Sequence, residues 1–262
     1  MFQPFMINTW IGGTIIAIAG GAVGFLVVAR RSAFLAHSLP NSAFSGAAGA
    51  ALVGVNPLAG MAVFSVGGAG LVTWLQRRSS RDVATAFTFV VLLALGMLFT
   101  SLSNEYAATF NSLLFGQLLG ISRAELITMA VLAVISLGAT AALYRPVLLD
   151  AVSSELARSR RAHGAGMDLA FALLVGLVTT IAVPIVGALL IFNLLVAPGA
   201  AARYLTSRPL VSVALSVAIA LVITWSAIAL GYLTDWPIGF FVGVLGALCY
   251  ALGRVFARLR GR

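Results

Sequence analysis

The chain has 262 residues, of which 61% are hydrophobic and only 9% are charged. Soluble domains carry about 25% charged residues, so this composition excludes an ordinary soluble globule and a disordered chain. One membrane span needs about 20 apolar residues, which leaves room for about nine spans and for no second folded domain. We predict an all-α integral membrane protein in which residues 1–262 form one polytopic bundle of about eight to nine transmembrane helices.

The net charge is +9, and all 16 basic residues are arginines because the chain contains no lysine. The arginines lie between apolar runs and form no long basic patch, which argues against a nucleic-acid partner. The single cysteine, Cys249, cannot form a disulfide within the chain. Its apolar neighbours in the sequence predict a buried, unreactive thiol.

Apolar runs alternate with short polar segments along the whole sequence. We expect spans over residues 7–29, 33–55, 58–75, 83–102, 125–143, 210–233 and 238–255, with two further spans in 167–202. Pro40 interrupts the second run, and Pro184 divides the run over 167–202. No basic residue precedes the first run, so we expect a retained span rather than a cleavable signal peptide. Residues 103–122 are too polar and aromatic to face lipid throughout.

Small residues recur at four-residue spacing within the expected spans, as in Gly20 and Gly24 and in Ser42, Gly46 and Ala50. Small residues let helix backbones approach each other closely in a membrane. The spacing predicts close packing of helices within one subunit, and a seam between two subunits is the alternative.

Cytoplasmic loops of membrane proteins are enriched in arginine and lysine. If the loop that contains Arg30 and Arg31 is cytoplasmic, the other loops alternate and only Arg123 lies outside. The remaining arginines then share the cytoplasmic side: Arg77, Arg78, Arg81, Arg145, Arg158, Arg160, Arg161, Arg203, Arg208, Arg254, Arg258, Arg260 and Arg262. This distribution predicts a plasma-membrane protein with its N-terminus outside and its C-terminus in the cytoplasm.

Several catalytic motifs are missing from the sequence. A Walker A motif needs a lysine, so the chain has no P-loop of its own for ATP, and CxxC, HExxH and GxSxG motifs do not occur. A membrane-embedded enzyme therefore has no supporting constellation of residues. A self-sufficient secondary transporter would need carboxylates within the spans. The acidic residues instead fall in expected loops or at the ends of spans.

Two polar side chains stand out within the second apolar run, His37 and Asn41. They are four residues apart, which places them on one face of a helix. A neutral imidazole binds borderline metals such as zinc, and an amide oxygen is a weaker, harder ligand. The pair is a candidate metal site; alternatively, His37 lies near the cytoplasmic surface and hydrogen-bonds a neighbouring helix. Asn193 has a similar pair of interpretations, an interhelical hydrogen bond or a place in a pore lining.

The longest polar segment covers residues 144–166. Pro146 suits the start of a short helix and Gly164 its end. Apolar residues such as Val152 and Leu156 lie among charged residues in this segment. The pattern predicts an amphipathic helix that either lies on the membrane or docks into a cytoplasmic partner.

Several short motifs follow one another in a specific order along the chain. They are Arg31 followed by Ala33-Phe34-Leu35, Leu113-Leu114-Phe115-Gly116 followed by Ser122-Arg123, Tyr144-Arg145-Pro146, Glu155-Leu156-Ala157-Arg158, and Val186-Gly187-Ala188-Leu189-Leu190 leading to Pro198 and Ala200-Ala201-Ala202. In this order, and over nearly the whole chain, the sequence resembles the permease subunits of the ABC transporters that import zinc and manganese, the ABC-3 family.

The resemblance implies a permease whose substrate is a divalent transition metal, zinc or manganese, with no permanently bound cofactor. It also implies a homodimer of permeases, a separate ABC ATPase subunit on the cytoplasmic face, and an extracellular or periplasmic metal-binding protein. Residues 145–166 would be the coupling segment that enters the ATPase. The candidate residues for this coupling are Arg145, Asp150, Glu155, Leu156 and Arg158.

The second span departs from the family in one respect. The resemblance implies an aspartate and, four residues later, a histidine that meet the metal in the pore, whereas this chain has His37 and Asn41. One carboxylate per subunit is lost, which changes the charge and the ligand type of the site. An importer of the same architecture for a metal chelate or another small solute is therefore an alternative function.

Overall fold

The computed structural model describes residues 4–103, 114, 116, 122–153, 155, 157, 164–188 and 190–259. These residues are almost entirely helical, and no strand occurs among them. The helices are α1 (Pro4–Ala29), α2 (Ala33–Leu52), α3 (Pro57–Leu75), α4 (Arg81–Ser101), α6 (Arg123–Val152), α8 (Ala165–Val186), α9 (Ile191–Leu205), α10 (Pro209–Thr234) and α11 (Ile238–Leu259). The all-α prediction is confirmed.

Polar residues in the short connections begin three of these helices. The Asn56 side chain accepts a hydrogen bond from the Leu58 N–H at 2.8 Å, at the start of α3. Ser80 caps α4 in the same way. At the start of α6, Ser122 and Glu125 form a reciprocal capping box, with bonds of 3.2 and 2.8 Å. Each cap satisfies backbone N–H groups that have no partner within their own helix, and so fixes where the helix begins.

Seven of the described helices are long and apolar enough to cross a membrane, namely α1, α3, α4, α6, α8, α10 and α11. The chain is therefore a multi-pass membrane protein. The other two lie where we expected spans, but α9 is only 15 residues long. The apolar sequence of α2 is interrupted by His37, Pro40 and Asn41, although the helix itself is continuous. Most of α2 is buried within the protein, so its polar residues are shielded from lipid by neighbouring helices.

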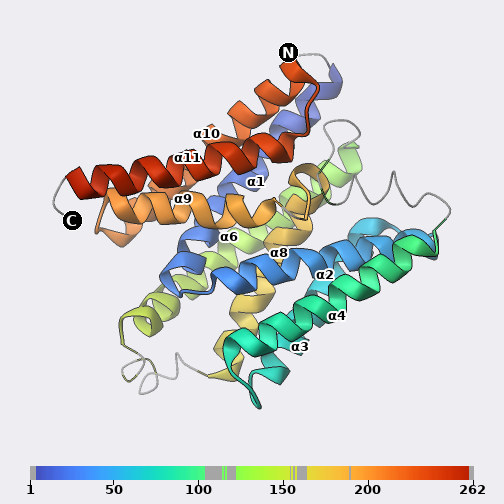
Figure 1. The fold of residues 1–262 in the computed structure, drawn as a ribbon, viewed down its shortest axis with the longest axis horizontal. Helices are drawn as coiled ribbons and strands as arrows, with labels where there is room; N and C mark the ends of the chain where they lie inside the picture. Colours follow the sequence, from blue (N-terminus) through green and yellow to red (C-terminus); the bar gives the residue numbers. More distant parts are fainter. Residues whose placement is uncertain are drawn as a thin grey trace.

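The helices form two groups (Figure 1). Helices α2, α3 and α4 pack on one another in the first group, and α1, α9, α10 and α11 pack together in the second. Helices α6 and α8 lie between them, with α8 in contact with both groups. The larger apolar core joins α1, α8 and α9, and a smaller one surrounds Phe44 of α2.

Backbones approach each other closely at glycines, as the small-residue spacing predicts. A Cβ atom on Gly24 of α1 would lie 2.0 Å from the Leu195 carbonyl oxygen of α9. A Cβ atom on Gly46 of α2 would lie 2.1 Å from the Gly60 carbonyl oxygen of α3. Packing within one subunit is thus confirmed at these two crossings.

The break predicted near Pro184 occurs at Gly187, where α8 ends. Gly187 and Gly116 both have positive φ, +87° and +78°. A Cβ atom on Gly116 would lie 2.1 Å from the Ile185 carbonyl oxygen, and one on Gly187 would lie 2.3 Å from the Leu114 carbonyl oxygen. Only glycine avoids both the backbone strain and the collision. Two motifs that are far apart in the sequence therefore meet here.

The prediction that Pro146 begins a separate short helix is wrong. Helix α6 runs without interruption from Arg123 to Val152, with Pro146 inside it. Proline removes only one backbone hydrogen bond from a helix, and neighbouring helices make this tolerable in a membrane protein. Gly164, with φ of +120°, is the residue that directly precedes α8.

Candidate functional site

His37 and Asn41 lie one turn apart on α2. The Asn41 amide nitrogen donates a hydrogen bond to the His37 carbonyl oxygen at 3.0 Å. Asn41 is only 1% exposed, and its Oδ1 atom has no hydrogen-bond partner within the described part of the chain. A buried acceptor without a donor costs about 1–3 kcal/mol, so this oxygen is available for a ligand.

The imidazole of His37 lies between two aromatic rings from different groups of helices. Its ring centroid is 5.4 Å from that of Phe89 in α4 and 5.2 Å from that of Phe192 in α9. The side chain is half-buried. Among the residues that the structure describes, neither ring nitrogen has a hydrogen-bond partner, so the interhelical hydrogen bond considered as an alternative is not found there. The two rings hold the imidazole at the junction of the two groups.

Pro40 separates the two polar residues and is itself buried. It has no N–H group, so the Ala36 carbonyl oxygen lacks its usual donor within the helix. The Ser42 hydroxyl is likewise buried and has no hydrogen-bond partner among the described residues. This part of α2 therefore presents several oxygen atoms whose hydrogen-bonding capacity is unused.

One subunit does not offer a complete metal site in the regions that the structure describes. No group of three or more histidine, cysteine, aspartate or glutamate side chains comes together there. His37 supplies a nitrogen ligand and Asn41 an amide oxygen, which together suit a borderline divalent cation but bind it weakly.

Asn193 connects two helices. Its amide nitrogen donates hydrogen bonds to the carbonyl oxygens of Val242 at 2.9 Å and Gly243 at 2.7 Å, both in α11. A Cβ atom on Gly246 would lie 2.4 Å from the same nitrogen, so the fit requires glycine. The interhelical hydrogen bond that the sequence allowed is present, and a pore-lining role for Asn193 stays a prediction.

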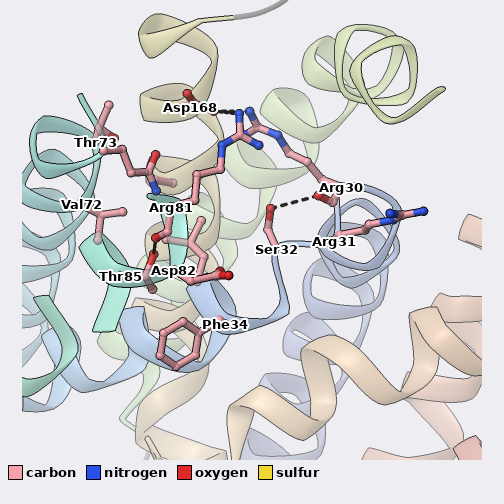
Figure 2. Close-up of a pocket in the computed structure, with 13 residues that line it drawn as sticks. Arg30, Arg31, Ser32, Phe34, Val72, Thr73, Arg81, Asp82, Thr85 and Asp168 are labelled. Atoms are coloured by element: carbon pink, nitrogen blue, oxygen red, sulfur yellow. Dashed lines mark hydrogen bonds and ion pairs between the residues drawn. The ribbon is translucent and has the colours of Figure 1, made fainter. Parts of the chain in front are cut away.

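A buried charged cluster lies where the chain turns from α1 to α2 (Figure 2). The Arg30 side chain is 4% exposed and forms ion pairs with Asp150, at 3.5 Å from Nε to Oδ2, and with Asp168. Asp168 also pairs with Arg81 at 3.2 Å, and Figure 2 shows both guanidinium groups extending toward it. The Arg30 guanidinium lies 4.8 Å above the Phe171 ring.

Sequence reasoning missed this cluster. It treated Arg30 only as a marker of membrane orientation and Asp150 only as a candidate contact for a partner. The cluster brings the ends of α1 and α6 together with the starts of α4 and α8. All of these ends were predicted to be cytoplasmic. The sequence offered one indication of the cluster. It contains only seven acidic residues, and two of them, Asp150 and Asp168, lie near the expected cytoplasmic ends of apolar runs.

The comparisons with known proteins follow this geometry. The sequence profile of the ABC 3 transport family matches residues 2–257. The chain belongs to the ABC 3 transport family.

Two relatives in the ABC 3 transport family carry metal names. The chain is 29% identical over 218 residues to the manganese import system permease protein ScaB of Streptococcus parasanguinis, covering 80% of this chain and 75% of that protein. It is 24% identical over 231 residues to the high-affinity zinc uptake system membrane protein ZnuB of Buchnera aphidicola, covering 87% and 88%.

A solved structure supports the same fold. The structure of PsaBC from Streptococcus pneumoniae in complex with Fab matches with a TM-score of 0.84 at 20% sequence identity. The match covers 96% of this chain and 91% of that one. The helical arrangement in Figure 1 is thus one that a solved structure also adopts.

The residues predicted to couple this ABC 3 family chain to an ATPase have different environments. Arg145 is exposed on α6, and Glu155 is exposed beyond its end. The Asp150 carboxylate is 6% exposed and faces Arg30. Leu156 and Arg158 lie outside the described residues. The structure thus separates Asp150, which is held inside the protein, from Arg145 and Glu155, which are exposed.

Proposed function

We propose that this chain is the permease subunit of an ABC importer that moves a divalent transition metal, zinc or manganese, into the cell. The match to the ABC 3 transport family over residues 2–257 carries the proposal. Relatives named for zinc uptake and manganese import indicate the class of substrate. ATP hydrolysis belongs to a separate ATPase subunit, and a metal-binding protein delivers the ion from outside.

The metal passes His37 and Asn41 in this proposal. The partnerless Asn41 Oδ1 atom supports it, as does the imidazole of His37, which lies against two aromatic rings. Two copies of the chain would place two of each ligand around a shared path. Their position between the two groups of helices suits alternating access, in which one group moves relative to the other.

A site without carboxylates has a specific chemical consequence. Neutral imidazole and amide ligands do not offset the charge of a divalent cation, so the ion stays only briefly. Transport requires this balance, because a site must bind well enough to admit an ion and weakly enough to release it. A neutral site also favours zinc over manganese, since imidazole is a better ligand for zinc and carboxylate oxygen for manganese.

The coupling segment over residues 145–166 is the proposed contact with the ATPase. The exposed side chains of Arg145 and Glu155 support this role. Charge reversal at Glu155 and Arg158 should release the ATPase or uncouple it while the helices remain folded. If the ATPase still binds and transport is normal, this segment lies on the membrane instead.

The test is transport by the assembled importer. The chain is co-purified with its ATPase subunit, reconstituted into liposomes, and supplied with radioactive zinc or manganese, with a hydrolysis-deficient ATPase as the matched control. We expect uptake that requires ATP hydrolysis, and no ATP hydrolysis by the chain alone. Uptake without ATP would overturn the proposal in favour of a secondary transporter. Uptake of a metal chelate but not of the free ion would assign the alternative substrate.

A further inference from the structure

Arg30 holds both ends of the segment that links α6 to α8. Asp150 lies in the last turn of α6, before this segment, and Asp168 lies in the first turns of α8, after it. The same guanidinium group pairs with both carboxylates. Residues 151–167 include most of the proposed coupling segment, so the helix ends on either side of this segment are held at one buried side chain.

Arg30 is in turn fixed with respect to α2. Helix α1 ends in a Schellman-type turn, in which the Arg31 N–H donates to the Val28 carbonyl oxygen at 3.2 Å and the Ser32 N–H to the Val27 carbonyl oxygen at 3.0 Å. Arg31 adopts the left-handed conformation that this turn requires, with φ of +56°. Helix α2 begins directly afterwards at Ala33.

The connection from this turn to the candidate site is short and helical. His37 is only seven residues beyond Arg30 and lies within the first two turns of α2. Helices α1 and α2 diverge from the turn and pack into different groups (Figure 1). A displacement of the turn must therefore tilt or shift the start of α2, because no flexible linker is present to absorb it.

We propose that Arg30 is a positioning residue that transmits movement of the segment over residues 151–167 to α2 and its His37. The inference rests on the proposed function, because the movement is the one that an ATPase would impose on that segment. Arg30 touches neither the metal nor the ATPase in this account. It acts by holding the ends of α6 and α8 that flank the segment in a fixed position relative to the start of α2.

The chemistry of the guanidinium group explains why an arginine stands here. Its planar group places Nη2 in a hydrogen bond with Asp168 and, at the same time, Nε 3.5 Å from the Asp150 carboxylate, whereas a lysine ammonium is a single point charge on a flexible stem. The Phe171 ring below the guanidinium restricts it further. Arg81 has only one of these contacts, with Asp168, and its side chain is 50% exposed. It provides a matched control on the same carboxylate.

The experiment compares Arg30→Lys with Arg81→Lys in the importer co-purified with its ATPase and reconstituted into liposomes. Both variants preserve the positive charge, so neither removes the cation from the surroundings of the buried carboxylates. ATP hydrolysis and metal uptake are measured on the same preparation. We expect Arg30→Lys to assemble and to hydrolyse ATP, while the number of ions moved per ATP falls about tenfold, within the usual range of coupling between sites. Arg81→Lys should keep the wild-type ratio.

Asp150→Asn provides a second measurement if Arg30→Lys does not assemble. It releases only the α6 end of the segment and leaves Asp168 paired, and it should also lower the ratio of ions to ATP. The inference is overturned if uptake and hydrolysis fall together, in proportion to the amount of assembled complex, because Arg30 is then purely structural. Absence of ATP-dependent uptake by the wild-type importer would overturn the proposed function itself. A wild-type importer that transports while its Arg30→Lys variant stays fully coupled overturns the inference alone.

Discussion

The Arg30 cluster and the His37–Asn41 pair are close in the sequence, but they differ in whether their buried polar groups have partners. In the cluster, each buried charge meets an opposite charge from another helix. In the pair, an imidazole and an amide oxygen have no polar partner among the described residues. Satisfied polar networks make a structure rigid, whereas an unsatisfied buried group is retained only if something else compensates for it. The first region holds helices together, and the second is the one that we propose receives a ligand.

The largest expected effect tests the His37–Asn41 pair. His37→Ala should reduce metal uptake by at least about 100-fold, because it removes the strongest available ligand. Uptake by the reconstituted importer measures the loss. Ser38→Ala is the matched control, since Ser38 is buried beside His37 and its hydroxyl donates only to the Thr85 carbonyl oxygen at 3.4 Å. Normal uptake by His37→Ala at unchanged protein level would make His37 a structural residue.

The next largest expected effect tests the Arg30 cluster. Arg30→Ala should lower the free energy of unfolding by about 3–5 kcal/mol, because it removes the buried cation that lies between Asp150 and Asp168. Arg81→Ala should cost less than about 1 kcal/mol, since its side chain is half exposed. Thermal unfolding in detergent compares the two variants. Equal losses would show that the cluster contributes no more than a surface ion pair.

Asn41→Ala separates stability from transport. The substitution removes one hydrogen bond, from the Asn41 amide to the His37 carbonyl oxygen, so the free energy of unfolding should fall by only about 1 kcal/mol. Uptake should fall about tenfold if the partnerless Oδ1 atom is a ligand, as for groups that tune metal affinity. A large loss of stability with unchanged transport per folded molecule would reverse this interpretation of Asn41.

The smallest expected effect is a change in the preference of the importer for zinc or manganese. The double variant His37→Asp and Asn41→His restores the residue types that the family resemblance implies. It should keep or increase uptake, and it should shift the preference toward manganese because a carboxylate is a harder ligand than imidazole. Competition between zinc and manganese in the uptake assay measures the shift. Loss of uptake without loss of folded protein would show that the two positions do not form one site.

The sequence was sufficient for features that depend on local patterns. Apolar runs located the helices to within a few residues except at the end of α6, which continues to Val152. The polar caps at Asn56, Ser80 and Ser122 lie where those runs begin. The spacing of Gly24 and Gly46 predicted close helix crossings because only a small residue permits them. His37 and Asn41 were placed on one face by helical periodicity alone.

The features that sequence reasoning missed depend on tertiary structure. Pro146 favours the start of a helix locally, but packing against neighbouring helices allows α6 to continue through it. The pairing of Arg30 with Asp168 joins residues 138 positions apart. No local pattern specifies which distant carboxylate an arginine will meet. The two aromatic rings around His37 come from α4 and α9, so their presence could not be read from α2.

The short turn between α1 and α2 also determines how far each part of α2 can move. Helix α2 has 20 residues, and at 1.5 Å per residue it is about 30 Å long, with His37 about 6 Å from its beginning. If α2 pivots at the turn by about 10°, its far end travels about 5 Å while His37 travels only about 1 Å. The polar pair lies close to the pivot and the far end of α2 lies far from it. Such a movement therefore widens the outer end of the path while His37 and Asn41 keep nearly the same position.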